Sequence, residues 1–240
     1  MSITTTLLED GVDVAGRANH REPIQVPATL PRVLLAEQHT LVREGLRNLL
    51  AGNVQVVADV ADGRALLTAV TRVQPDLVLL DIALPGLNGL DVARQLGRLC
   101  PHTRAVFVTM HSEPAFVREA FRAGAAAYVS KTSQFGELLH AVREVLAGRR
   151  YLSSSIAPDL AQLLSEPGLA PGGLTDKLTT RQREVLQLVA EGRTAQQAAE
   201  VLHISRKTVE YHKASLMRSL GARSCAELTR YAFAHGMIGP

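Results

Sequence analysis

Three residues of this chain, Asp81, Thr109 and Lys131, have side chains suited to transferring a group onto a carboxylate. Each follows or ends a short apolar run, which is typical of a strand buried on both faces of a parallel sheet. Parallel strands end at a common edge, where open α/β sheets bind ligands, so we expect the three side chains to converge. A carboxylate nucleophile, a hydroxyl and a cation, together with a Mg²⁺ ion held by oxygens, are what phosphoryl transfer to an aspartate requires.

Asp81 is the centre of the most informative stretch, QPDLVLLDIALPGLNGLDV. It ends the apolar run 77–80 and precedes the turn Leu84-Pro85-Gly86, where Pro fixes φ and Gly is free to take positive φ. This placement suits a nucleophile or a metal ligand. The simpler alternative is that Asp81 only caps the following segment.

Strand and helix patterns alternate along the first two thirds of the chain. The predicted strands are 32–36, 54–60, 77–80, 105–109 and 126–130, and the predicted helices are 40–51, 64–73, 90–99, 114–123 and 135–147. This alternation predicts an α/β domain over residues 31–150 with a doubly wound, five-stranded parallel sheet.

Two segments lack such periodicity. Residues 1–30 contain scattered Gly and Pro among polar residues, and we interpret them as a poorly ordered extension. Residues 151–174 include a possible helix at 153–164 and then the Pro- and Gly-rich SEPGLAPGG, which favours a linker between domains.

The last segment, residues 175–240, is predicted to be an all-α domain of four helices. Two short helices are joined by His203-Ile204-Ser205, and the second of them is basic, which is typical of a helix-turn-helix. From residue 175 onward there are ten Lys and Arg against six Asp and Glu, whereas the whole chain has a net charge of only +3. This excess predicts a polyanion partner, unless it is merely a solvated basic face.

The basic helix places its apolar stripe opposite a polar face that contains Lys207, Tyr211, Ala214 and Arg218. Basic side chains suit phosphate or guanine contacts, an acidic one can accept from cytosine, and a small residue allows close approach to the groove. A hydroxyl and an N–H at a helix start can bind a phosphate. The predicted DNA contacts are Thr194, Lys207, Thr208, Glu210, Tyr211, Lys213, Ala214 and Arg218.

The remaining composition excludes several other classes. Cys100 and Cys225 are far apart, so they predict neither a metal site nor a disulfide framework. The N-terminus does not resemble a secretory signal, and no apolar run is long enough for a membrane span. We therefore expect a cytoplasmic protein.

The segment DLVLLDIALPGLNGLDV resembles the phosphoacceptor segment of bacterial response-regulator receiver domains, and the resemblance extends over about 32–147. It implies that Asp81 accepts a phosphoryl group from a sensor histidine kinase, that Thr109 senses this group and that Lys131 binds it. It also implies that Tyr128 is an aromatic switch and that the backbone carbonyl of Ala83 ligates Mg²⁺.

One departure from that family concerns the metal. Receivers carry an acidic pair after the first strand, within a stretch such as LADDH, whereas this chain has LAEQH. Glu37 keeps the first carboxylate, but Gln38 replaces the one that usually binds Mg²⁺ directly. Because Mg²⁺ favours charged oxygens, weak metal binding and poor phosphorylation are expected alongside the ordinary alternative in which the other ligands suffice.

The stretch LTTRQREVLQLVAEGRTAQQAAEVLHISRKTVEYHKASLMRSLGARS resembles LuxR-type DNA-binding domains, closest to the NarL/FixJ family. Together the two resemblances imply a homodimeric transcription regulator that binds promoter DNA under control of its receiver. Two alternatives remain at this point. One is a degenerate receiver that works without phosphorylation, favoured by Gln38, and the other is a phosphohydrolase-like enzyme using the Asp81 crevice, which would leave the basic domain unexplained.

Overall fold

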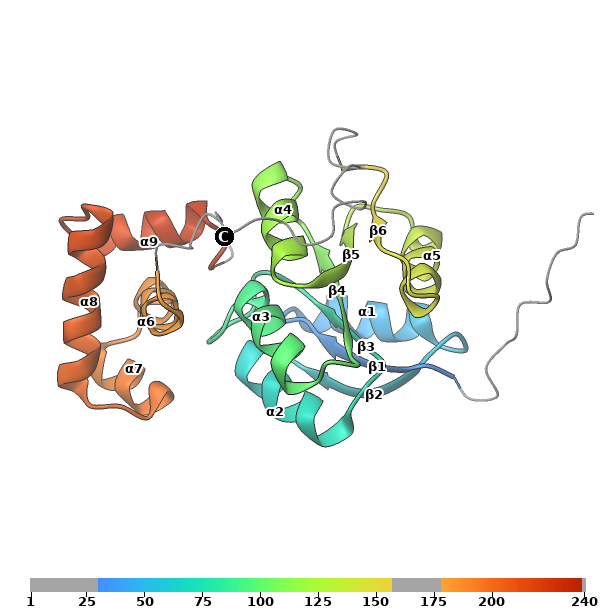
Figure 1. Ribbon diagram of the computed structural model, residues 1–240, viewed down its shortest axis with the longest axis horizontal. Coiled ribbons are helices and arrows are strands. Elements are labelled where there is room, and N and C mark those ends of the chain that lie inside the picture. Colours follow the sequence, from blue (N-terminus) through green and yellow to red (C-terminus); the bar gives the residue numbers. More distant parts are fainter. Residues whose placement is uncertain (1–29, 157–177, 239–240) are drawn as a thin grey trace, which may run out of the picture.

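The computed structural model describes residues 30–156 and 178–238, which form an α/β domain and a helical domain (Figure 1). The predicted N-terminal extension, apart from Leu30, lies outside the described residues. So does the predicted linker from residue 157 onward, with most of the possible helix at 153–164. Residues 153–156, which are described, form a turn rather than the start of that helix.

The α/β domain is built on a parallel sheet with strand order β2-β1-β3-β4-β5-β6. This order confirms the predicted doubly wound fold, because the chain moves outward from β1 to one side of the sheet and then crosses to the other. The elements are β1 (Arg32–Ala36), α1 (Thr40–Leu50), β2 (Gln55–Val60), α2 (Gly63–Val73), β3 (Leu77–Leu80), α3 (Gly89–Leu99), β4 (Arg104–Thr109), α4 (Pro114–Arg122), β5 (Ala125–Ser130), α5 (Phe135–Leu146) and β6 (Tyr151–Leu152).

The sheet has six strands among the described residues, rather than the predicted five. The additional strand, β6, pairs with β5 through Tyr151 and Leu152. It is held by Glu137 of α5, whose carboxylate oxygen accepts hydrogen bonds from the Tyr151 hydroxyl at 3.0 Å and the Ser154 backbone N–H at 2.7 Å. A strand this short has no periodicity of its own, so a pattern search cannot find it. The α/β domain therefore continues past the predicted boundary at residue 150.

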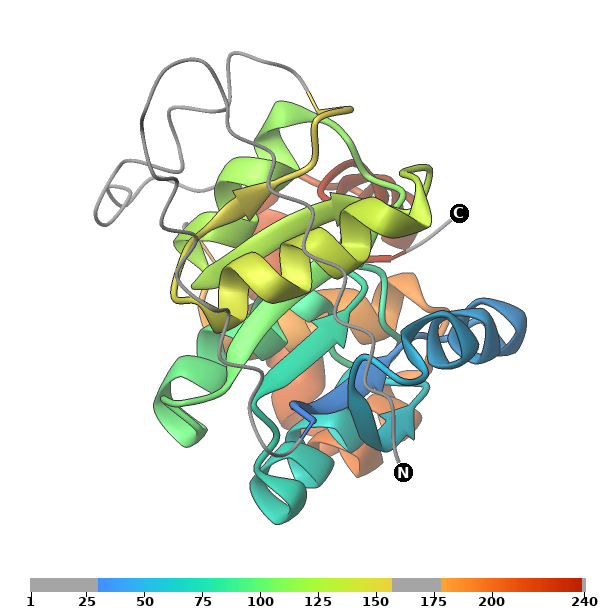
Figure 2. The same ribbon diagram turned by 90° about the vertical axis from the view of Figure 1, so that its right-hand side faces the viewer.

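Two apolar layers enclose the sheet. α1 and α5 cover one face over a core that includes Leu35, Leu79 and Val142, and this side faces the viewer in Figure 2. α2, α3 and α4 cover the other face over a core that includes Leu80, Phe107 and Val117. With helices on both faces, β3 is buried along its full length, as its continuous apolar sequence predicts.

The helical domain confirms the four predicted helices: α6 (Thr180–Ala190), α7 (Ala195–Leu202), α8 (Arg206–Leu220) and α9 (Cys225–Ala234). Their inner faces form one core that includes Leu186, Leu202, Val209 and Leu216. The helix starts are capped by hydroxyl side chains, because Thr179, Thr194, Ser205 and Ser224 each accept a hydrogen bond from a backbone N–H in the first turn.

Cys100 and Cys225 are both free thiols. Within residues 30–156 and 178–238, no helix combines the length and the apolar character needed to cross a membrane.

Candidate functional site

The carboxyl ends of the strands bring Glu37, Asp81 and Lys131 together. The Lys131 ammonium lies between the two carboxylates, 2.6 Å from Oδ2 of Asp81 and 2.6 Å from Oε2 of Glu37. Glu37 is 2% exposed and Asp81 is 5% exposed. Buried charges of this kind need partners, and one cation here serves two anions.

The other oxygens of the two carboxylates are also bound. Oε1 of Glu37 lies 2.9 Å from the backbone N–H of His39 and 2.7 Å from its Nδ1. Oδ1 of Asp81 accepts the Ile82 N–H at 2.6 Å. Both acid groups are therefore held in fixed orientations rather than exposed to water as free carboxylates.

The pKa of Lys131 reflects this position. Burial alone lowers the pKa of the ammonium, but the charge of Asp81 and the hydrogen bonds to Asp81 and Glu37 outweigh it, so the pKa is raised from its ordinary value. Lys131 is therefore a permanent positive charge beside the Asp81 carboxylate at neutral pH.

The loop that follows Asp81 needs glycine at its far end. A Cβ on Gly89, the first residue of α3, would lie 2.1 Å from the backbone oxygen of Asp81. The Gly89 N–H donates to the Ile82 carbonyl at 2.8 Å. Only glycine permits this close return of the chain, which fixes the backbone around Asp81 and Ala83.

Thr109 and Tyr128 lie deeper in the same region and are fully buried. Thr109 ends β4, and its hydroxyl oxygen is 3.4 Å from the His111 N–H, a long and weak contact. The Tyr128 hydroxyl donates to the His111 carbonyl at 2.8 Å, and its ring stacks against Phe107. Burial, followed by the charges of Glu113 and Asp81, raises the pKa of Tyr128 well above its ordinary value. Both side chains thus contact the start of the loop that leads to α4.

Gln38 and Ala83 lie at a cavity of about 300 Å³ between the two domains. Leu84 and Pro85 line it from the α/β domain, and residues of α6 and of the C-terminal segment line it from the other side. Where receivers have two acidic residues after the first strand, this chain has only one carboxylate, that of Glu37, because the next residue is Gln38.

This donor set can hold Mg²⁺, but with less charge than a pocket of three carboxylates. Glu37 and Asp81 are neighbours, since both lie within 2.6 Å of the same ammonium nitrogen. Among the described residues there is no group of three or more His, Cys, Asp or Glu side chains placed to hold a metal. Glu37, Asp81 and the Ala83 carbonyl are the groups that fit, with Gln38 as an uncharged neighbour.

The second predicted site is the outer face of α8. Lys207, Glu210, Ala214 and Arg218 are exposed, and Tyr211 is 65% exposed. Within the described part of the chain, the charged members of this set form no ion pair. This face is therefore solvated and able to meet a ligand.

The remaining predicted DNA contacts differ in their surroundings. Lys213 is half-buried on the flank of α8. The half-buried Thr208 hydroxyl lies 2.8 Å from the Ser205 hydroxyl at the helix start. Thr194 forms a capping box with Gln197, in which its N–H donates to the Gln197 side chain at 2.9 Å. The hydroxyl proton of Thr194, rather than its N–H, is thus the donor that remains.

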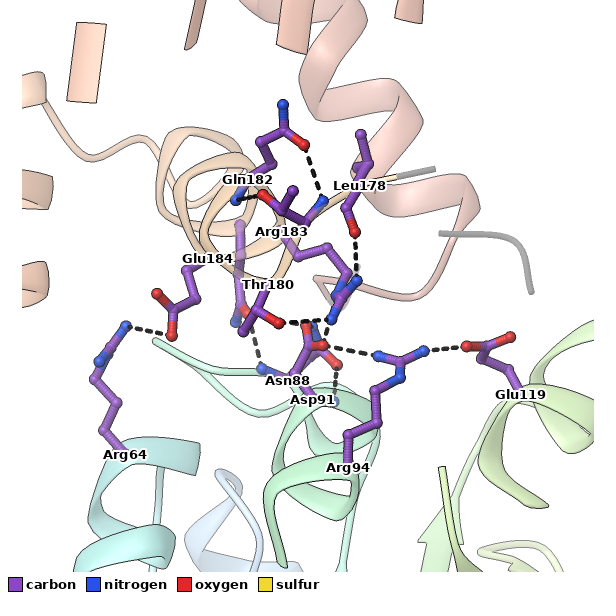
Figure 3. Close-up of polar contacts among 12 residues, drawn as sticks. Arg64, Asn88, Asp91, Arg94, Glu119, Leu178, Thr180, Gln182, Arg183 and Glu184 are labelled. Atoms are coloured by element: carbon purple, nitrogen blue, oxygen red, sulfur yellow. Dashed lines mark hydrogen bonds and ion pairs between the residues drawn. The ribbon is translucent and has the colours of Figure 1, made fainter. Parts of the chain in front are cut away.

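Contacts between the two domains were not predicted. Gln187 and the neighbouring Glu191 bind the loop after Asp81 from α6 and its C-terminal end. Arg183, also on α6, binds Asp91 at the start of α3 (Figure 3). The only signal in the sequence is Gln187 itself, a polar residue among the apolar Leu186 and Leu188, and it is 1% exposed. Such a position indicates a buried partner but does not identify one.

Comparison with known proteins agrees with both halves of the molecule. Residues 33–143 match the model of the response regulator receiver domain, and residues 176–232 match that of the bacterial regulatory proteins of the luxR family.

Two relatives match along most of their length. Response regulator GacA of Pseudomonas aeruginosa is 34% identical over 86% of this chain and 97% of its own. Response regulator UvrY of Escherichia coli is 30% identical over 85% of this chain and 94% of its own. The crystal structure of a LuxR-family two-component response regulator from Aurantimonas is 36% identical over 57% of this chain and 96% of that one, with a TM-score of 0.51.

These matches, with the receiver fold and the helix-turn-helix, support a transcription regulator and give no support to the phosphohydrolase alternative. The chain belongs to the NarL/FixJ-family response regulators, in which a receiver domain is joined to a LuxR-type DNA-binding domain.

Proposed function

We propose that Asp81 accepts a phosphoryl group from the phosphohistidine of a sensor histidine kinase, and that this controls binding of promoter DNA. A carboxylate oxygen of Asp81 attacks the phosphorus, and a P–O bond forms while the P–N bond breaks. The leaving imidazole nitrogen keeps the electron pair. The observation that carries the proposal is the Lys131 ammonium, 2.6 Å from Oδ2 of Asp81, because a fixed cation at the acceptor oxygen offsets the charge of the arriving group.

The other residues of the pocket have distinct roles in this proposal. Thr109 donates its hydroxyl hydrogen bond to a phosphoryl oxygen, because in its contact with His111 the hydroxyl oxygen is the acceptor and the hydroxyl proton is not used. When Thr109 shifts to bind the phosphoryl group, Tyr128 responds, because both residues contact His111. Its buried ring is then the switch that reports the reaction to the loop before α4.

Glu37, Asp81 and the Ala83 carbonyl would hold Mg²⁺. The ion supplies positive charge that neutralises the phosphoryl oxygens during transfer. Gln38 offers only an amide oxygen, so we expect weaker metal binding than a third carboxylate would give.

The output in this proposal is a homodimer that reads two half-sites of an inverted repeat. The exposed face of α8 enters the major groove, with Lys207 and Arg218 contacting phosphates or guanine and Glu210 accepting from cytosine. Tyr211, Ala214, Thr208 and Lys213 complete the contact, and Thr194 binds a backbone phosphate from the start of α7.

The direct test uses full-length protein, a small acyl phosphate and Mg²⁺, with intact mass as the readout. We expect one phosphoryl group per chain on the wild type and none on Asp81→Asn. An unmodified wild-type mass after an hour of incubation would overturn the proposal.

A second candidate is control without phosphorylation, and two observations favour it. Gln38 removes a metal-binding charge, and Lys131 already satisfies both Glu37 and Asp81. In this case concentration, another ligand or a partner sets DNA binding. Asp81→Asn would then bind DNA as the wild type does, with or without the phosphodonor.

A further inference from the structure

Side chains of α6 and its C-terminal end in the DNA-binding domain form hydrogen bonds with the loop that follows Asp81. Arg183 and Gln187 lie four residues apart on one face of the helix, and Glu191 follows after another four. All three bind receiver groups: Arg183 binds Asp91, as Figure 3 shows, and Gln187 and Glu191 bind the loop. We call Gln187 and Glu191, with their bonds to this loop, the loop clamp.

Gln187 binds both sides of the loop with one side chain. Its amide N–H donates to the Leu84 carbonyl at 2.8 Å, and its amide oxygen accepts the Asn88 N–H at 2.7 Å. Glu191 accepts the Gly86 N–H at 2.8 Å, between those two points. These three partners are backbone groups, and the Asn88 side chain adds only a long contact of 3.5 Å to Gln187, so the clamp depends mainly on the shape of the loop.

A buried ion-pair network lies beside the clamp. Arg183 donates to Asp91 of α3 at 2.6 Å, and the same Asp91 oxygen accepts from Arg94 at 2.7 Å. Arg94 in turn pairs with Glu119 of α4. The ion-pair network therefore extends from Arg183 of α6 through α3 to α4 of the receiver (Figure 3).

The clamped loop is part of the acceptor site itself. It begins at Ile82, whose N–H binds the Asp81 carboxylate, and it carries the Ala83 carbonyl. A change at Asp81 that moves this backbone must alter the clamp. By reciprocity, the state of the clamp must alter the acceptor site.

The docked receiver leaves the predicted DNA-reading face uncovered. Lys207, Tyr211, Ala214 and Arg218 remain exposed with both domains present. In Figure 1, α8 lies on the side of the helical domain away from the sheet, and α6 lies between them. The outer face of α8 is therefore already exposed when the clamp is formed, and release of the clamp would not uncover it.

We propose that the loop clamp controls DNA binding by fixing where the DNA-binding domain is held, not by masking α8. The inference rests on the proposed reading of two half-sites by a homodimer. Two DNA-binding domains held at fixed positions by the receivers of a dimer fit two half-sites at one spacing. If the domains were free on flexible tethers, the second domain would have a lower effective concentration at its half-site, and the dimer would be less selective for the spacing.

The test compares the full-length double variant Gln187→Ala/Glu191→Ala with wild type on two duplexes selected by the wild-type chain. One carries an inverted repeat and the other a single half-site. We expect half-site affinity to change less than about threefold. We expect the additional affinity for the repeat to fall at least tenfold and the preference for one spacing to broaden. The control is Gln55→Ala, which removes an exposed glutamine at the amino end of β2, whereas the clamped loop follows the carboxyl end of β3.

Two results would overturn the proposal. A gain of tenfold or more on the half-site would indicate masking, and unchanged binding to both duplexes would show that the clamp has no role. A wild type that binds no duplex would instead contradict the proposed function.

A second measurement does not depend on the folding of the double variant. Spin labels are placed at Cys225 and at Arg98→Cys, in a chain with Cys100→Ser, and the labelled chain is diluted with unlabelled protein. We expect one interdomain distance that does not change when the inverted repeat is bound. A broadened or lengthened distance on DNA would contradict the proposal.

Discussion

The acceptor pocket and the outer face of α8 both carry the charges that function needs, but they hold them in opposite ways. In the pocket, Glu37 and Asp81 are buried and share the Lys131 ammonium. On the outer face of α8, Lys207, Glu210 and Arg218 are exposed and form no ion pairs within the described part of the chain. A mutation in the pocket should therefore change stability and chemistry together, whereas one on α8 should change DNA affinity alone.

The largest effect should come from Lys131→Ala. This change leaves Glu37 and Asp81 buried together without their cation, and such uncompensated charge costs about 3–5 kcal/mol. Phosphorylation should also slow about 100-fold or more. Urea unfolding and phosphodonor labelling of the full chain measure the two losses.

Adding Glu37→Gln to Lys131→Ala should recover part of the stability, because it removes the repulsion between the two carboxylates. A loss below about 1 kcal/mol for Lys131→Ala would show that the pair is not held as described.

Lys207→Ala tests the exposed outer face of α8. It should weaken DNA binding by about 1–3 kcal/mol if Lys207 contacts a base, while the free energy of unfolding changes by less than about 0.5 kcal/mol. Fluorescence anisotropy at several salt concentrations measures the affinity. Arg72→Ala, an exposed arginine on α2, is the control and should leave it unchanged. Equal affinity for Lys207→Ala and wild type would remove Lys207 from the DNA contact.

Gln38→Asp tests whether residue 38 contributes to Mg²⁺ binding in the pocket. It restores a third carboxylate, so Mg²⁺ affinity should rise about tenfold, or about 1.4 kcal/mol, and phosphodonor labelling should become faster. Calorimetric titration measures the affinity, with Gln55→Asp as a control for added charge. Unchanged Mg²⁺ binding would mean that Gln38 does not face the metal.

Glu137→Gln should have the smallest effect, below about 1 kcal/mol. Burial raises the pKa of Glu137, but the hydrogen bonds of Ser154, Ser153, Ser133 and Tyr151 outweigh it and lower the pKa from 4.5 to about 2. Because the pKa of Glu137 is lower in the folded state, its ionised carboxylate stabilises the fold at pH values above the unfolded-state pKa of about 4.5. This stabilisation is lost as the pH falls from about 4.5 to about 2. Urea unfolding should show this decline in wild type and a smaller one in Glu137→Gln. Parallel declines would exclude the Glu137 contribution.

Much of this molecule could be predicted from local pattern. The helices and the long strands were found because each has an apolar face and a turn or cap at its ends. The placement of Asp81, Thr109 and Lys131 at one edge of the sheet could be predicted because their strands are parallel neighbours, while their roles in phosphoryl transfer stay predictions. β6 was missed, since its two residues are held by the side chain of Glu137 rather than by apolar periodicity.

The loop clamp could not be predicted for a different reason. The partners of Gln187 are backbone groups of Leu84 and Asn88, about a hundred residues earlier in the chain. Backbone partners carry no sequence signature, so a buried glutamine on α6 indicates a contact without identifying it. Docking between separately folded domains is a property of their surfaces, which periodicity does not describe.

In the proposed function, the state of Asp81 governs DNA binding. The most direct measurement is the affinity of the full chain for its inverted repeat, with and without phosphodonor and Mg²⁺, for wild type and Asp81→Asn. We expect tighter binding by the treated wild type and no response from Asp81→Asn. Identical affinities for all four samples, with the wild type fully phosphorylated by mass, would contradict it.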